Sequence, residues 1–296
     1  MEKMKFRGHE TFFIRKGWLN KGMRNIIKDP YVFMGVNGNP SDILGIGTNM
    51  IKSLRYWLQA VGISKEKMSG KKMQELTELG KIINENDPYT EELGTLALLH
   101  YSLAINKELA TSWYFFFNVF SNIEFTKEDF INQLKNYIKI NGVDVSERAI
   151  EDDYNCILST YIPRIKSSTS KINPESNIDC PLGELNLIDI LDKKEKIYKK
   201  VPIVFEKLHP LIILAIILKE YPEKKEVKIS SILDEDKSIG KIFNLDMINL
   251  LKILYILERM EYIKVIRTAG LDVIRIETNM DYIGVVKEYY NSINSY

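Results

Sequence analysis

The stretch SDILGIGTNMIKSLRYWL, residues 41–58, has the pattern of two helices joined by a short turn. Gly45 and Gly47 lie in the turn, and glycine suits such a position because it adopts backbone conformations that other residues avoid. From Met50 onward the apolar residues recur at helical spacing, and Thr48 is expected to cap this second helix. The stretch therefore predicts helix–turn–helix geometry, in which the second helix can lie in the major groove of DNA.

The side of this second helix that faces away from its apolar positions carries polar and cationic residues. Polar side chains near the start of such a helix can reach base edges, and cationic side chains can neutralise phosphates. Lys65, Lys67, Lys71 and Lys72 follow in a predicted loop or wing. The alternative is an amphipathic helix with a solvated cationic face. On the first interpretation, the DNA contacts come from Thr48, Asn49, Lys52, Ser53, Arg55 and Tyr56.

The charge of the chain is separated along the sequence. Its 296 residues include 41 Lys and Arg against 40 Asp and Glu, which gives a formal net charge of only +1. Residues 1–72, however, carry a net charge of +9, residues 73–162 carry −9, and residues 163–296 carry +1. A segment of +9 is the footprint of a polyanion-binding surface, although two solvated faces of opposite sign would give the same counts.

Composition indicates an ordinary soluble protein. Hydrophobic residues make up 45% of the chain, and the longest apolar run, at residues 211–218, is far shorter than the roughly 20 residues that span a bilayer. Two cysteines provide neither a disulfide framework nor the spacing of a zinc site. We therefore expect a cytoplasmic protein that makes no membrane contact.

Helical and strand patterns predict three regions. Residues 1–86 form a basic helix–turn–helix or winged-helix-like DNA-binding module, and residues 87–200 form a helical middle with a flexible loop near 163–179. In residues 201–296, several helices precede a predicted β-hairpin, which is the order of a winged helix. The predicted fold class is mainly α with small β-hairpins (α+β), with winged-helix-like modules at both ends of a helical middle.

Several motifs, in a fixed order along most of the chain, resemble those of the DUF4007 family. Members of this family include SspB-like proteins of bacterial DNA phosphorothioation and phage-defence modules. The resemblance is specific because it rests on many motifs rather than on one. They are Gly8–Phe12, Arg15–Leu19, Leu44–Trp57, Asp87–Tyr89, Thr95–His100, Ser112–Asn118, Asp179–Leu185 and Thr268–Leu271.

The resemblance implies a DNA-binding subunit of a phosphorothioation-type modification and anti-phage system. It is similar to a nicking component that acts on double-stranded DNA beside a cysteine desulfurase, an ATPase and a sulfur-transfer enzyme. Replacing a phosphate oxygen by sulfur needs access to the backbone, which a strand break would provide. The alternative is a non-catalytic winged-helix adaptor or transcription regulator that binds DNA without cleaving it.

A nick requires an attacking water, stabilisation of the charged transition state and protonation of the leaving oxygen. Near the N-terminus, His9 can act as acid or base, Glu10 as a metal ligand or orienting group, and the arginines as phosphate clamps. The alternative is that this segment is a cap whose polar groups brace the fold. The nickase hypothesis assigns His9, Glu10 and Arg15 to catalysis, and Arg7 and Lys16 to DNA binding.

A nickase of this kind would need a divalent metal, for which magnesium is the first expectation; without nicking, no cofactor is expected. The sequence does not identify the ligands of such a metal. The acidic run Glu151–Asp153 is one candidate, and a solvated helix face is the alternative for it.

Overall fold

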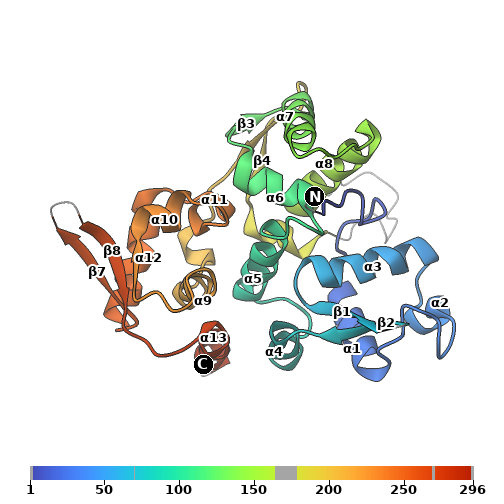
Figure 1. Cartoon of the computed structure of the whole chain (residues 1–296), viewed down its shortest axis with the longest axis horizontal. Coiled ribbons are helices and arrows are strands. Elements are labelled where there is room, and N and C mark those ends of the chain that lie inside the picture. Colours follow the sequence, from blue (N-terminus) through green and yellow to red (C-terminus); the bar gives the residue numbers. More distant parts are fainter. Residues whose placement is uncertain (1–2, 70, 164–178, 269–270, 295–296) are drawn as a thin grey trace, which may run out of the picture. The chain divides into compact units, whose positions relative to one another are not determined.

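The computed structural model describes residues 3–69, 71–163, 179–268 and 271–294 (Figure 1). The chain divides into two compact units, Met1–Lys200 and Val201–Tyr296, here called the first and second units. Each unit is built mainly of helices and also contains at least one small antiparallel sheet. The predicted α+β fold class is therefore confirmed.

The first unit begins with helices and ends with the β4–β5 strand pair. It contains helices α1 (Trp18–Lys28), α2 (Pro40–Leu44), α3 (Thr48–Ala60), α4 (Glu78–Asn86), α5 (Leu93–Ala104), α6 (Thr111–Tyr114), α7 (Lys127–Ile140) and α8 (Glu147–Tyr161). A π-helical turn, η1 (Phe115–Val119), follows α6, and a 3-10 helix, η3 (Pro181–Leu185), follows α8. The strands are β1 (Ser64–Ser69), β2 (Lys71–Leu76), β3 (Glu124–Phe125), β4 (Ile188–Asp192) and β5 (Ile197–Lys200).

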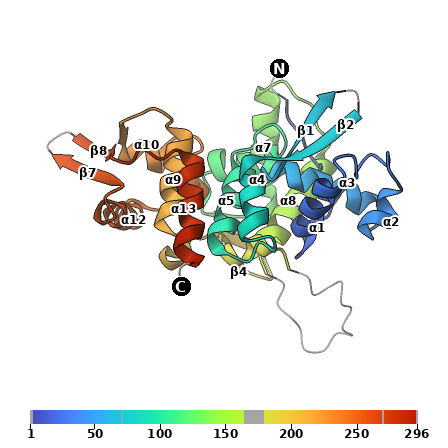
Figure 2. The same ribbon diagram turned by 90° about the horizontal axis from the view of Figure 1, so that it is seen from below.

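The helix–turn–helix pattern at residues 41–58 corresponds to α2 and α3, which pack against each other. Asn39 caps α2, because its side chain accepts the Ser41 N–H at 3.1 Å, and Gly45 leaves that helix at a φ of +61°. The cap of α3 is Gly47, and Thr48 is the first helical residue, so the expectation of a Thr48 cap was wrong. Figures 1 and 2 show α1, α3, β1 and β2 lying together.

The lysine-rich segment after α3, predicted to be a loop or wing, is a two-stranded antiparallel hairpin. In its register Ser64 faces Leu76 and Glu66 faces Gln74. Side chains alternate between the two faces of a strand, so one face carries residues 64, 66, 72, 74 and 76. The lysines at 65 and 67 belong to the opposite face.

The aromatic run at residues 113–120 forms the core of the first unit, as its density of large side chains predicts. Phe116 is fully buried, and its ring lies between 4.9 and 6.0 Å from those of Phe117, Phe120, Phe125 and Phe130. Burying one such side chain stabilises a fold by roughly 1.5–3 kcal/mol, so this cluster is a large apolar contribution.

The second unit combines helices with a three-stranded sheet of order β6-β8-β7, and α10 and α12 contact this sheet. Its helix α9 packs against α13 and α12, and the β7–β8 hairpin follows α12 as the sequence predicts. The elements are the 3-10 helix η4 (Phe205–Lys207), α9 (Pro210–Glu220), β6 (Glu226–Lys228), α10 (Ile229–Asp234), α11 (Ile239–Ile242), α12 (Met247–Arg259), β7 (Ile263–Thr268), β8 (Leu271–Ile276) and α13 (Tyr282–Asn294).

The expected start of the third region, residue 201, coincides with the start of the second unit, whereas the expected boundary at 86/87 lies within the first unit. The division into three functional regions stays a prediction. Most of the predicted loop near 163–179 lies outside the described residues. Across the ranges that the structure describes, no helix combines the length and the apolar character that crossing a membrane requires.

Candidate nucleic-acid interface

Residues 5–12, here called the N-terminal strap, run over the surface of α3 in an unusual backbone conformation. Arg7, Glu10 and Thr11 have φ values of 55°, 49° and 67°, a left-handed region that residues other than glycine seldom adopt. Gly8 is required for the close approach to α3, because a Cβ there would lie 2.5 Å from the ring of Tyr56. The motif Gly8–Phe12 therefore encodes a specific backbone path.

A buried hydrogen-bond network holds the strap in this path. Asp153 of α8 is 1% exposed, and its carboxylate accepts the Arg7 backbone N–H and the His9 Nε2–H, both at 2.8 Å, and the Ser112 hydroxyl at 2.5 Å. The Thr11 N–H donates to His9 Nδ1 at 3.0 Å. Since Nδ1 accepts this bond, the proton of the neutral ring lies on Nε2 and points at Asp153.

The position of His9 therefore does not suit the role of catalytic acid or base that the sequence suggests. The side chain is 0% exposed, both ring nitrogens are bonded, and the ring stacks on Trp57 with 6.1 Å between centroids. A general acid or base must reach the reacting group directly or through one water. The arrangement instead matches the alternative in which the polar groups of this segment brace the fold.

The predicted DNA-binding residues of α3 divide between the surface and the core. Thr48, Asn49 and Lys52 are exposed at the start of the helix. Ser53 is fully buried and Tyr56 is 5% exposed, so the expectation that these two decorate the free side of the helix was wrong. The reason is that both belong to the part of α3 that the strap covers, as the contact of Gly8 with Tyr56 shows.

Arg55 is partly exposed and joins α3 to the β1–β2 hairpin. Its Nε donates to Glu66 Oε2 at 3.0 Å, its Nη2 contacts the same oxygen, and Gln74 Nε2 donates to that oxygen at 2.7 Å. Lys5, which sequence reasoning did not select, lies beside this group with its Nζ 5.2 Å from the centroid of the Tyr56 ring. Its pKa is lowered, first by burial and then by the charge of Arg55.

On the other face of the hairpin, two lysines converge on one carboxylate. Lys65 Nζ lies 2.9 Å and Lys67 Nζ 2.5 Å from the carboxylate oxygens of Glu75. Hydrogen bonds from Lys67 and Lys65 lower the pKa of Glu75. Lys65 and Lys67 therefore share one carboxylate on the face of the hairpin opposite to Arg55 and Glu66.

Arg7 and Lys16, predicted to bind DNA, both form ion pairs with acidic residues. Arg7 Nε lies 2.9 Å from Asp152 of α8, and Lys16 Nζ lies 3.4 Å from Glu91. Both cations remain exposed, at 46% and 66% of their side chains. Exposed pairs of this kind are weak, so either cation can exchange its partner for a phosphate at little cost.

Arg15 and Glu10, predicted to take part in catalysis, are both partly exposed. The guanidinium of Arg15 lies 5.6 Å from the ring centroid of Phe12 and 5.4 Å from that of Trp18. Such stacking orients an arginine while leaving its N–H groups able to bind an anion. Their roles in catalysis stay predictions.

The acidic run on α8 does not fit a divalent metal. Glu151 pairs with Lys127 at 3.2 Å, Asp152 pairs with Arg7, and Asp153 is occupied by three donors. In the described part of the chain, no three His, Cys, Asp or Glu side chains gather as a metal-binding group. We therefore assign no step of the chemistry to a metal held by these residues.

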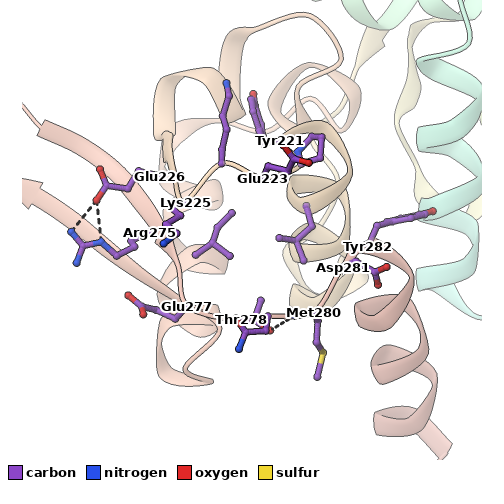
Figure 3. A pocket seen from close by; sticks show the side chains of 15 residues that line it. Tyr221, Glu223, Lys225, Glu226, Arg275, Glu277, Thr278, Met280, Asp281 and Tyr282 are labelled. Carbon is purple, nitrogen blue, oxygen red and sulfur yellow. Dashed lines mark hydrogen bonds and ion pairs between the residues drawn. The ribbon is translucent and has the colours of Figure 1, made fainter.

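The second unit contains a separate cavity of about 960 Å³ between the end of α9, the sheet and the start of α13 (Figure 3). Its lining carries both signs of charge, and Arg275 Nε and Nη2 donate to Glu226 Oε1 at 3.0 and 2.9 Å. None of the residues that we predicted to bind DNA lines this cavity. Nothing in its lining selects one class of ligand.

Comparisons with known proteins agree with the geometry of the fold. Residues 6–290 match the model of a family described as protein of unknown function (DUF4007). Two solved structures, an SspB crystal structure and a magnesium ion-bound SspB crystal structure, each superpose with a TM-score of 0.84 at 23% identity. Each alignment covers 99% of this chain and 89% of the other. No curated protein sequence matches.

Proposed function

Because the chain belongs to the DUF4007 family and has the fold of SspB, we propose that it is the DNA-binding subunit of a phosphorothioation-type DNA modification and anti-phage system. The observation that carries the proposal is the exposed, cationic start of α3, beside the strap and the β1–β2 hairpin. The partners implied by the family resemblance are a cysteine desulfurase, an ATPase and a sulfur-transfer enzyme.

The start of α3 has the properties of a phosphate-contacting helix end. The 13-residue helix begins at Gly47 without a side-chain cap, so its first N–H groups are open to an anion. Among the described residues, no atom lies within 4 Å of the position that a Cβ would take at Gly45 or Gly47. A DNA backbone can therefore approach the turn closely, while Asn49 and Lys52 face the same solvent.

The order of elements in the first unit also supports DNA binding. The helices α2 and α3 are followed at once by the β1–β2 hairpin, which is the arrangement of a helix–turn–helix with a wing. A helix in the major groove and a hairpin beside it would contact the duplex on two sides. We propose that α3 reads the groove and that the hairpin contacts the backbone.

Fluorescence anisotropy with a labelled DNA duplex tests this proposal. Lys52→Glu replaces an attracting charge by a repelling one, so it should weaken binding by tenfold or more at low salt, whereas Asn49→Ala should weaken it less. Lys194→Glu makes the same change in the turn between β4 and β5, at an exposed lysine outside the proposed interface. Equal affinities of the Lys52 and Lys194 variants would contradict the assignment of α3.

We further propose that the protein nicks DNA, with Glu10 and Arg15 as the side chains that act on the backbone. Both lie on or next to the strap and are partly exposed, whereas His9 is buried and positions the strap. Arg15 would clamp a phosphate, and Glu10 would orient the attacking water. Because the acidic run of α8 does not fit a metal, its carboxylates have no part in this proposal.

Conversion of supercoiled plasmid to the open-circular form measures nicking, with magnesium and with a chelator. Glu10→Gln and Arg15→Gln should abolish the open-circular product while duplex affinity stays within a few-fold of wild type. If both variants nick plasmid as fast as wild type, Glu10 and Arg15 do not belong to the nicking site. Salt-dependent duplex binding without any nicking would favour the adaptor or regulator function instead.

The proposed pathway has its own test in cells. DNA that contains phosphorothioate linkages is cleaved by iodine, so deletion of this gene from its module should make genomic DNA resistant to iodine. Complementation by wild type should restore cleavage, and complementation by Lys52→Glu should not. If iodine still cleaves the genomic DNA after the deletion, the protein is not required for the modification.

A further inference from the structure

Three cationic side chains from separate segments of the first unit converge at one edge of α3. Lys5 comes from the strap, and its Nζ lies 5.2 Å from the centroid of the Tyr56 ring. Arg55, the preceding residue of α3, extends to Glu66 of β1. Lys5 lies close enough to this pair that the charges of Arg55 and Glu66 both act on its pKa.

The register of the hairpin adds Lys72 to this group. Glu66 pairs with Gln74, and Met68 pairs with Lys72, so residues 66, 72 and 74 share one face of the two strands. Arg55 contacts Glu66 and Gln74 donates to it, which identifies this face as the one directed at α3. Lys72 is exposed on that face, at the side of the cluster open to solvent.

The charges of this cluster do not balance. Three cations share this edge of α3 with two carboxylates, Glu66 and Glu10, and a single oxygen of Glu66 already accepts hydrogen bonds from Arg55 and Gln74. Besides burial, the charges of Arg55 and Lys72 lower the pKa of Lys5, while Glu66 and Glu10 act in the opposite direction. The positive charges repel one another, so a bound anion would relieve that repulsion.

Hydrogen bonds of the strap backbone fix the position of Lys5. The Lys5 N–H donates to Thr111 Oγ1 at 2.9 Å, and two residues further on the Arg7 N–H donates to the buried Asp153. At the residue after Arg7, a Cβ on Gly8 would lie 2.5 Å from the Tyr56 ring and 3.0 Å from Cε of Lys5. The absence of a side chain at residue 8 is therefore what lets Lys5 lie over Tyr56, next to Arg55.

We infer that Lys5, Arg55 and Lys72 form a binding site for a single phosphate group. Lysine ammonium groups and the free edge of an arginine are the donors that bind phosphate oxygens most strongly. With three cations against the two carboxylates of Glu66 and Glu10, the cluster keeps a net charge of +1 and suits an oxyanion. The identification of this group as a phosphodiester of the DNA backbone rests on the proposed function; the binding of phosphate itself does not.

The test compares Lys5→Gln and Lys72→Gln with Lys67→Gln, an exposed lysine on the opposite face of the same hairpin. Each phosphate contact contributes about 0.9 to the slope of log K against log salt for duplex DNA. Because the site holds one phosphate, loss of both lysines should lower that slope by about 0.9 and weaken binding at least tenfold at low salt. Lys67→Gln should leave the slope nearly unchanged.

A second measurement uses inorganic pyrophosphate and thermal unfolding at constant ionic strength. All three tryptophans, residues 18, 57 and 113, belong to the first unit, so their fluorescence reports the unfolding of that unit. Pyrophosphate should raise the midpoint for wild type and Lys67→Gln, and the rise should be lost in the Lys5→Gln, Lys72→Gln double variant. An equal rise in all of these proteins would overturn the site.

The outcomes separate this inference from the proposed function. If wild type binds duplex DNA through Lys52 but the Lys5 and Lys72 variants keep the full salt slope and the pyrophosphate effect, the inference fails and DNA binding stands. If wild type does not bind duplex DNA but the pyrophosphate effect is lost in the double variant, the site stands and its phosphate belongs to another molecule.

Discussion

Substitution of Asp153 by alanine tests whether the buried network holds the strap in place. The change removes the common acceptor of three hydrogen bonds, from the Arg7 N–H, the His9 ring and the Ser112 hydroxyl. These donors would remain in a region where Asp153 is only 1% exposed, so water cannot easily replace the carboxylate. The first unit should therefore lose much of its stability.

The magnitude follows from the number and kind of these bonds. A hydrogen bond to a charged group contributes roughly 1.5–3 kcal/mol, and the terms of a shared network are not additive. Leaving a buried donor without its partner costs roughly 1–3 kcal/mol, and Asp153→Ala would leave three such donors. We expect Asp153→Ala to lower the free energy of unfolding of the first unit by about 3–5 kcal/mol.

Urea unfolding followed by tryptophan fluorescence measures this loss, since all three tryptophans lie in the first unit. Asp152→Ala is the matched control, because Asp152 is the adjacent residue and its pair with Arg7 is solvent-accessible. That control should cost about 0–1 kcal/mol. A loss below about 1 kcal/mol for Asp153→Ala, or equal losses for the two variants, would refute the reasoning.

Three further predictions concern packing and pH. Gly80→Ala would place a Cβ 2.1 Å from the carbonyl oxygen of Ile63 and should cost about 1–3 kcal/mol in urea unfolding, whereas Gly47→Ala, where space is open, should change stability by less than about 1 kcal/mol. Burial raises the pKa of the Cys180 thiol to about 12, so the stabilisation that it provides is complete below about pH 8.5 and is lost as pH rises. The urea midpoint should therefore fall as pH rises from about 8.5 toward about 12, and the fall should be smaller in Cys180→Ala. Burial lowers the pKa of His209, so the stability that its neutral form provides is present above about pH 6.5 and is lost as pH falls. The amide protection factors of α9, which are corrected for the intrinsic exchange rate at each pH, should therefore fall on acidification, and unchanged protection factors would contradict this.

Much of the fold could be predicted because its signals are local. The glycines at 45 and 47, the apolar spacing from Met50 onward and the aromatic run at 113–120 each determine structure within one or two turns of helix. For the same reason, the β7–β8 hairpin was predicted in its correct place after α12. For the lysine-rich β1–β2 hairpin the sequence predicted only a loop or wing, because lysine and glutamate are not typical strand residues.

The arrangement of the candidate site depended on contacts that span long stretches of sequence. His9 and Asp153 are 144 residues apart, and only the packing of α8 against the strap makes one the partner of the other. Periodicity assigns Ser53 and Tyr56 to the surface of α3, but the strap covers that part of the helix. Lys5 gives no signal in the sequence at all, because its importance comes from its position over Tyr56.

Lysine footprinting with an amine-reactive reagent, with and without a DNA duplex, tests the central claim most directly. It reports on every accessible lysine of the wild-type protein in a single experiment. The proposal predicts that the duplex protects Lys5, Lys52 and Lys72, while Lys139 and Lys194 of the same unit stay equally reactive. Protection confined to other lysines, or none in the presence of saturating duplex, would contradict the proposal that α3, the strap and the β1–β2 hairpin bind DNA.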